Sequence, residues 1–253
     1  MFLSPRGLSA TLLAFSLLAG CQLINTPGGS EAEPGPAPSV THVGRLGAGL
    51  LGGSLTDQPH LEIVSTASFT RLWDEGGTGS REPVSVWRPQ APSGEYALIG
   101  DYAHGSHLKP TDGALLVRAV NEDPANPLLK APIDYELRWE SRGSGGRLDG
   151  SFWEPIAPPG YVALGMVGNP SFENPSRVGN PSLDSYRCVR EDLCEQRPYG
   201  ARIWYDKGTS AKMDGAFFGI PELPGGFGVF KSYATPSAQS WVLKKPSESQ
   251  NAD

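Results

Sequence analysis

Aromatic and other apolar positions recur along the chain in three copies, separated by segments rich in glycine, proline and serine. In each copy two large aromatic side chains lie 14 residues apart, and the first aromatic residues of successive copies lie 66 and 65 residues apart. The aromatic pairs are Trp73 and Trp87, Trp139 and Trp153, and Trp204 and Phe218. Self-similarity at a fixed period is typical of repeat architectures. The pattern therefore predicts three structural repeats, over about 69–134, 135–199 and 200–246.

Each repeat predicts four short strands. The first two carry the aromatic pair, the third begins with an aromatic residue after a Pro/Gly turn, and the fourth follows a loop of variable length. The third strands begin at Tyr96, Tyr161 and Phe227, and the fourth strands are expected over 114–120, 186–190 and 241–245. Short strands divided by Gly and Pro turns favour antiparallel sheets. We predict an all-β, β-prism-like fold of three pseudo-symmetric antiparallel sheets, with the paired aromatic residues in its core.

Three such sheets each bury one face against the other two, so the repeats should form a single domain, over 41–253. An additional strand is expected over 61–64, ahead of the first repeat, where it would close the ring.

The N-terminus has the pattern of a bacterial lipoprotein signal. Arg6 precedes an apolar run over 8–18 that is too short for an ordinary transmembrane helix. The run ends in Leu18-Ala-Gly-Cys21, which resembles the lipobox at which the signal peptide is cleaved and the thiol is lipidated. We predict a signal peptide over 1–20, a lipid on Cys21 and a flexible tether over 21–40. Gln22 favours the outer membrane, on its periplasmic side or at the cell surface.

Composition narrows the possible partners and supports the fold. The formal net charge of -6 argues against a nucleic-acid partner, which usually needs a dense basic face. The 32 glycines and 24 prolines leave little room for long helices. Cys188 and Cys194 lie in a compartment where disulfides persist, so we expect them to pair, with two free thiols as the alternative.

Four segments carry a resemblance to a known family, most clearly in the second repeat. These segments are Trp139-Glu-Ser-Arg-Gly-Ser-Gly, Asp149-Gly-Ser-Phe-Trp153-Glu-Pro-Ile, Pro158-Pro-Gly-Tyr161-Val-Ala-Leu-Gly165 and Tyr186-Arg-Cys-Val-Arg-Glu-Asp-Leu193. They resemble the family named for vacuolar protein sorting-associated protein 62, over about 69–245. The resemblance implies a β-prism-like domain and brings no reaction, cofactor or settled ligand with it.

The copies depart from one another at a few positions. Pro83 stands where the second and third copies have Asp149 and Asp214, and Lys231 stands where the other copies have Gly100 and Gly165. A ligand site that depends on such an Asp or Gly would therefore exist in fewer than three copies.

Three polar positions repeat after the first tryptophan of each copy. Position +4 is glycine (Gly77, Gly143, Gly208), position +5 is a hydroxyl residue (Thr78, Ser144, Thr209) and position +8 is basic (Arg81, Arg147, Lys212). Acidic residues follow closely, including Asp149 and Asp214. One interpretation is a ligand site for an anionic or hydroxyl-rich group, held by the basic side chains and loop amides. The other is a tight turn closed by its hydroxyl and braced by a local ion pair.

Signatures of an enzyme are missing from the sequence. The chain has no His-Glu-x-x-His motif and no Gly-x-Ser-x-Gly motif, so we expect no catalytic residues, no metal site and no cofactor. The favoured hypothesis is a non-enzymatic, lipid-anchored module that binds a glycan or a lipid headgroup, with Tyr96, Tyr161 and Phe227 as candidate exposed rings. The alternative is a protein-interaction lipoprotein, an envelope adaptor or a toxin-blocking immunity factor, acting through the long loops 121–132 and 169–185. A hydrolase is the remote alternative.

Overall fold

Short strands account for nearly all the regular structure in the computed structural model, which describes residues 37–47, 58–177 and 184–245. These residues belong to one compact unit, Ala37–Asp253. The predicted signal peptide, the predicted lipid site Cys21 and most of the predicted tether lie outside the described residues. No helix within the described ranges is long and apolar enough to cross a bilayer.

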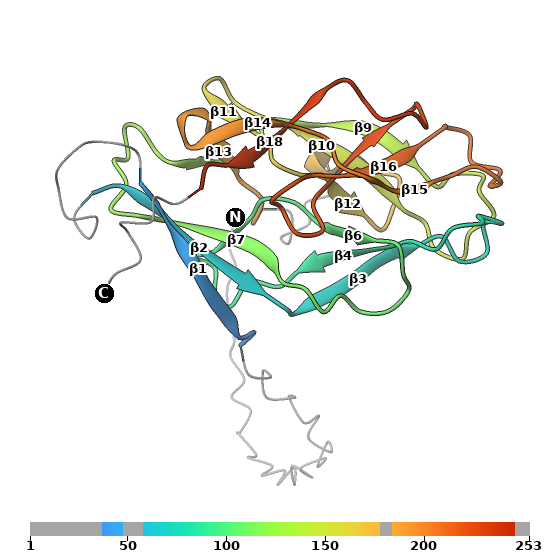
Figure 1. The fold of residues 1–253 in the computed structure, drawn as a ribbon, viewed down its shortest axis with the longest axis horizontal. Helices are drawn as coiled ribbons and strands as arrows, with labels where there is room; N and C mark the ends of the chain where they lie inside the picture. Colours follow the sequence, from blue (N-terminus) through green and yellow to red (C-terminus); the bar gives the residue numbers. More distant parts are fainter. Residues whose placement is uncertain (1–36, 48–57, 178–183, 246–253) are drawn as a thin grey trace, which may run out of the picture. The chain divides into compact units, whose positions relative to one another are not determined.

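Each repeat contributes one three-stranded antiparallel sheet, and we call these three the inner sheets (Figure 1). In strand order they are β3 (Phe69–Asp74), β4 (Ser85–Pro89) and β6 (Tyr102–His104); β9 (Asp134–Glu140), β10 (Ser151–Ile156) and β12 (Val167–Asn169); and β15 (Arg202–Tyr205), β16 (Ala216–Gly219) and β17 (Phe227–Phe230). In each sheet the two aromatic strands pair, and the third strand pairs with the second. The predicted all-β fold with three pseudo-symmetric antiparallel sheets is confirmed.

The remaining strands form three further sheets, which we call the outer sheets. They are β1 (Val40–Gly47), β2 (His60–Thr66), β7 (Ala114–Val120) and β5 (Ala97–Leu98); β11 (Tyr161–Val162), β13 (Cys188–Arg190) and β8 (Leu129–Lys130); and β14 (Cys194–Pro198) with β18 (Gln239–Leu243). Within the described residues, two short 3-10 turns, Pro175–Arg177 and Glu191–Leu193, interrupt the strands. The expected strand over 61–64 is present within β2, whereas β1, which pairs with it, was not predicted.

A bulge precedes the first tryptophan of every repeat. The pairing register shifts between Arg71 and Trp73 in β3, between Leu137 and Trp139 in β9, and between Arg202 and Trp204 in β15. A bulge leaves one residue unpaired and re-aims the side chains beside it. The three shifts therefore turn each tryptophan in the same way.

The three re-aimed tryptophans meet one another at the pseudo-threefold axis. Trp73, Trp139 and Trp204 are at most 1% exposed, and their ring centroids lie 5.4, 5.5 and 5.7 Å apart with steep interplanar angles. Edge-to-face packing of this kind is favourable beyond the area that it buries. These rings are the centre of the core between the inner sheets, so the predicted core position of the tryptophans is confirmed.

The second aromatic residue of each repeat shows why the third copy differs. The indole N–H groups of Trp87 and Trp153 each donate, at 2.7 Å, to the hydroxyl of a serine two residues earlier, Ser85 or Ser151. In the third repeat Phe218 replaces the tryptophan, and the residue two positions earlier is Ala216. Donor and acceptor are lost together, which leaves no buried polar group without its partner.

The predicted correspondence of the third strands is wrong in the last repeat. The partners of the second aromatic residue are Tyr102 for Trp87, Val167 for Trp153 and Gly228 for Phe218. Phe227 thus belongs to an inner sheet, while Tyr96 and Tyr161 lie at or beside the outer strands β5 and β11. Lys231 is accordingly no structural counterpart of Gly100 and Gly165. The backbones of these two glycines are in contact, and a Cβ on Gly100 would lie 2.9 Å from the Gly165 Cα.

The predicted disulfide between Cys188 and Cys194 is wrong, since both are free, buried thiols. Cys188 pairs with Lys130 of β8, and Cys194 pairs with Leu243 of β18, so the two residues belong to different outer sheets. The 3-10 turn between them carries the chain from one sheet to the next. Burial is the main cause that raises the pKa of each thiol, to about 12.

We expect both thiols to resist alkylation in the native protein. The thiolate is the reactive form, and with a pKa near 12 only about one thiol in ten thousand is ionised at pH 8. Treating the unit Ala37–Asp253 with iodoacetamide should give no mass increase in native buffer and two additions in concentrated guanidinium chloride. Absence of any addition under denaturing, non-reducing conditions would instead mean that the two cysteines are bonded.

Candidate functional site

The loops between the first two strands of each repeat gather at one end of the inner sheets, at the right of Figure 1. We call residues 75–84, 141–150 and 206–215 the repeat loops. Each opens with the same turn, in which the N–H of the hydroxyl residue donates to the carbonyl three residues earlier at 2.9 Å. The glycines at position +4 have φ values of 91, 82 and 97°, a left-handed conformation that non-glycine residues rarely adopt.

The hydroxyl residues close these turns. The side-chain oxygens of Thr78, Ser144 and Thr209 each accept a hydrogen bond, at 3.2 Å, from the backbone N–H two residues later. Thr78 and Ser144 are also buried. Their repeated chemistry is therefore explained by the turn itself, and they present little to a ligand.

The repeat loops are joined in a ring by the tryptophans. The indole N–H of Trp73 donates to the Leu148 carbonyl of the second loop, and that of Trp139 donates to the Met213 carbonyl of the third. Trp204 completes the ring by donating to the Ser80 hydroxyl of the first loop, at 2.9 Å. Each core tryptophan thus holds the loop of the next repeat, and the three loops form one continuous surface.

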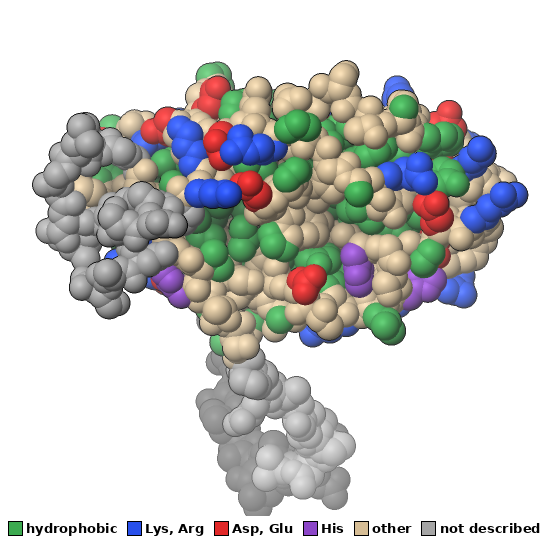
Figure 2. All heavy atoms as spheres, viewed as in Figure 1, with side chains coloured by type: hydrophobic (Ala, Val, Ile, Leu, Met, Phe, Trp, Pro, Cys, Tyr) green, Lys and Arg blue, Asp and Glu red, His purple; other side chains and the backbone are tan. Residues whose placement is uncertain are grey.

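The basic residues at position +8 lie on that surface. Arg81, Arg147 and Lys212 are all exposed, and within the described part of the chain none of them forms an ion pair. Figure 2 shows both basic and acidic side chains at this end. The local ion pair that was expected to brace each turn is therefore not formed.

Two of these basic residues extend over the neighbouring loop. Arg147 lies against the first loop, where its backbone N–H donates to the Gly76 carbonyl and a Cβ on Gly76 would come within 2.2 Å of its guanidinium. Lys212 lies in the same way against Gly143 of the second loop, with its Cγ 3.3 Å from where a Cβ would stand. The glycines make room for the basic side chains, which fixes the side chains on the shared surface.

The acidic residues near position +8 have other roles. Glu82 pairs with Arg202 at 3.3 Å, and Asp214 accepts a hydrogen bond from the Tyr233 hydroxyl at 3.2 Å. Tyr233 also donates to the buried Asp206, and burial, followed by this hydrogen bond, raises the pKa of its hydroxyl above the ordinary value. Asp149 is exposed. Among the described residues none of these acidic groups forms an ion pair with the three basic groups, and the Asp74 carboxylate lies close to the Arg147 guanidinium, since a Cβ on Gly76 would stand 2.6 Å from the one and 2.2 Å from the other.

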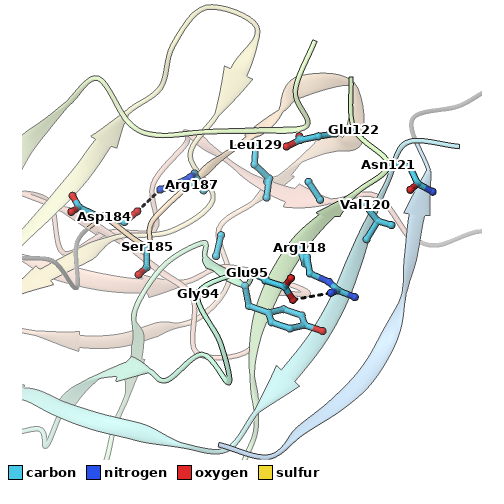
Figure 3. Close-up of a pocket in the computed structure, with 13 residues that line it drawn as sticks. Gly94, Glu95, Arg118, Val120, Asn121, Glu122, Leu129, Asp184, Ser185 and Arg187 are labelled. Carbon is cyan, nitrogen blue, oxygen red and sulfur yellow. Dashed lines mark hydrogen bonds and ion pairs between the residues drawn. The ribbon is translucent and has the colours of Figure 1, made fainter. Parts of the chain in front are cut away.

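Only one of the three candidate rings lies at an open cavity. Tyr161 and Phe227 are buried, with 8% and 0% exposed, so their expected exposure is wrong. Tyr96 is half-buried and lines a pocket of about 580 Å³ between β5, β7, β8 and Arg187 (Figure 3). Spacing along the sequence gave no sign of this pocket, because its walls come from segments as far apart as Gly94 and Arg187.

Most of the chain matches a known protein family. The family described as vacuolar protein sorting-associated protein 62 matches residues 34–222, which include all three basic positions and the first two repeats. The chain belongs to the vacuolar protein sorting-associated protein 62 family. No curated protein matches the chain.

A solved structure resembles this member of the vacuolar protein sorting-associated protein 62 family. It is the crystal structure of GNIP1Aa from Chromobacterium piscinae, with 27% sequence identity and a TM-score of 0.57. The similarity covers 70% of this chain and 34% of GNIP1Aa, so the chain spans about a third of that protein. The β-rich, prism-like module is thus shared, while two thirds of GNIP1Aa have no counterpart in the similarity.

Proposed function

We propose that this protein is a non-enzymatic binding module of the bacterial envelope, and that its repeat loops bind an anionic group on a lipid headgroup or a glycan. The observation that carries the proposal is the presence of three exposed basic side chains, Arg81, Arg147 and Lys212, at equivalent positions of one continuous surface and without carboxylate partners among the described residues. Two of them, Arg147 and Lys212, pack against the neighbouring loop, and a basic side chain held in this way binds a phosphate or carboxylate group with a smaller loss of conformational entropy.

The threefold arrangement favours a surface that displays many identical groups. A ligand that presents one anion engages one repeat, whereas a membrane or a polymeric glycan engages all three together and gains avidity. The predicted lipid on Cys21 would hold the module close to such a surface. The chain carries a formal net charge of -6, so attraction to anions would come from this local patch rather than from the protein as a whole.

We expect the unit Ala37–Asp253, which lacks Cys21, to sediment with vesicles that contain phosphatidylglycerol and to remain in solution with phosphatidylcholine alone. A basic residue near an anionic surface contributes about 1 kcal/mol, so changing all three basic residues to glutamine should weaken binding by on the order of a hundredfold. Each single change should cost about fivefold, and added salt should weaken binding steeply.

A matched control removes the same charge from the outer sheets. The triple variant Lys130→Gln, Lys244→Gln, Lys245→Gln should bind vesicles almost as the unmodified protein does. A panel of phosphorylated and neutral oligosaccharides separates the two ligand sources, since competition by the phosphorylated sugars would favour a glycan. If neither vesicles nor sugars bind, or if the control variant loses as much as the loop variant, the repeat loops are not an anion site and a protein partner becomes the better hypothesis.

A further inference from the structure

A pocket lies away from the repeat loops, between two outer sheets. Its walls are the segment 94–97 with β5, the end of β7 with the following residues 121–122, Leu129 of β8 and the segment 184–187 that leads into β13 (Figure 3). Its volume of about 580 Å³ lies within the range of small-molecule sites.

Charges of both signs line the pocket, and most are already engaged. Arg118 binds Glu62 at 2.7 Å and Glu95 at 3.0 Å, and its guanidinium lies over the Tyr96 ring at 5.3 Å. On the opposite wall, Arg187 donates to backbone carbonyls, including that of Tyr186 at 2.8 Å. These contacts hold the polar wall in one arrangement, which lowers the entropic cost of binding a ligand.

The balance of charge excludes an anion. Two basic residues, Arg118 and Arg187, face three acidic residues, Glu95, Glu122 and Asp184, so the lining carries a formal charge of -1. An anionic ligand would add to this excess of negative charge, and a wholly apolar ligand would strip water from charged groups without replacing their hydrogen bonds. A ligand that suits this wall is uncharged and offers both donors and acceptors.

Hydroxyl groups meet these requirements, because each donates and accepts. Adjacent hydroxyls can donate to Glu122 or Asp184 and accept from Arg187, while Leu129, Val120 and the Tyr96 ring supply apolar surface for C–H groups. We propose that this pocket binds a neutral saccharide. The proposal goes beyond the anion site of the repeat loops, since the two sites lie on different sheets and require ligands of different charge.

A variant that fills the pocket tests this directly. Gly94 belongs to the pocket lining, a Cβ added to it meets no atom within 4 Å, and its φ lies outside the left-handed region, so Gly94→Phe adds a ring to the lining without strain on the fold. The full chain, purified in detergent, is titrated with neutral mono- and disaccharides and followed by saturation-transfer NMR and calorimetry. We expect saturable binding that Gly94→Phe abolishes and Glu122→Gln weakens by about tenfold, through the loss of a charged hydrogen bond.

Controls separate this site from the repeat loops. The variant that lacks Arg81, Arg147 and Lys212 should bind the neutral saccharide unchanged, and near-ultraviolet circular dichroism should show that Gly94→Phe keeps its native packing. Binding of amines or of acidic sugars alone would overturn the proposal, as would saccharide binding that survives Gly94→Phe. Absence of binding to every neutral sugar tested would also overturn it.

Discussion

Replacing Trp139 by alanine is expected to lower the free energy of unfolding by about 4 kcal/mol. The ring is fully buried, it packs against Trp73 and Trp204, and its N–H donates to both the Met213 carbonyl and the Asp206 carboxylate. Truncation leaves a cavity at the meeting point of all three inner sheets and takes a hydrogen bond from the buried Asp206. Urea unfolding followed by circular dichroism measures the change.

A tryptophan outside this cluster provides the comparison. Trp241 in β18 is half-buried against a separate core cluster that includes Leu193 and Val242, so Trp241→Ala should cost less than half as much. Because Trp73 and Trp139 touch, the double change to alanine should cost less than the sum of the two single changes. Equal costs for Trp139→Ala and Trp241→Ala, with additive behaviour of the pair, would contradict a central role for the three-tryptophan cluster.

The inner sheets and their turns could be predicted because residues close in sequence determine them. The first two strands of each repeat form a hairpin, so the spacing of Trp73 and Trp87 reports directly on the pairing of β3 with β4. The turn chemistry is local too, since Gly77 supplies the left-handed φ and Thr78 binds the backbone two residues later. Repetition at the same offsets made both features visible.

The pairing of the outer sheets and the pocket could not be predicted, because they join distant segments, in part through very short strands. β8 has two residues and pairs with Cys188 and Val189 of β13, and β14 pairs with β18 across some forty residues of chain. Strands of two or three residues show no alternation that a sequence pattern can detect. The false disulfide has the same origin. Only five residues separate Cys188 from Cys194, which suggested a local contact, but the chain passes from one outer sheet to another within them.

The third strand of the last repeat was predicted from an alignment of the three copies, and the strand pairing in the structure does not follow that alignment. An aromatic residue after a Pro/Gly turn placed Phe227 beside Tyr96 and Tyr161, but the chain reaches the inner sheet sooner in the third repeat and Phe227 pairs with Gly219. The bulges before the tryptophans were hidden for a similar reason. A bulge is visible only once the partner strand is known.

A buried polar network joins the first two repeats outside the aromatic core. Asp101 is 2% exposed and accepts hydrogen bonds from the Tyr186 hydroxyl and, at 2.7 Å, from the Gly168 N–H. The guanidinium of Arg88, also buried, lies 3.4 Å from the same carboxylate and donates to Tyr186 at 2.9 Å. Burial raises the pKa of the Asp101 carboxyl, and these three donors oppose that rise.

Replacing Asp101 by alanine should therefore lower the free energy of unfolding by about 4 kcal/mol, because the change removes the counter-charge of the buried Arg88 guanidinium and the acceptor of the Tyr186 hydroxyl and the Gly168 N–H. The double variant Arg88→Met, Asp101→Leu removes both charges and fills the buried space with apolar side chains. Its loss of unfolding free energy should therefore be clearly smaller than the sum of the losses for Arg88→Met and Asp101→Leu alone. Urea denaturation of the four proteins completes the cycle. Strict additivity would mean that Arg88 and Asp101 contribute independently, and that packing of β4 against Tyr186, rather than the ion pair, holds the first two repeats together.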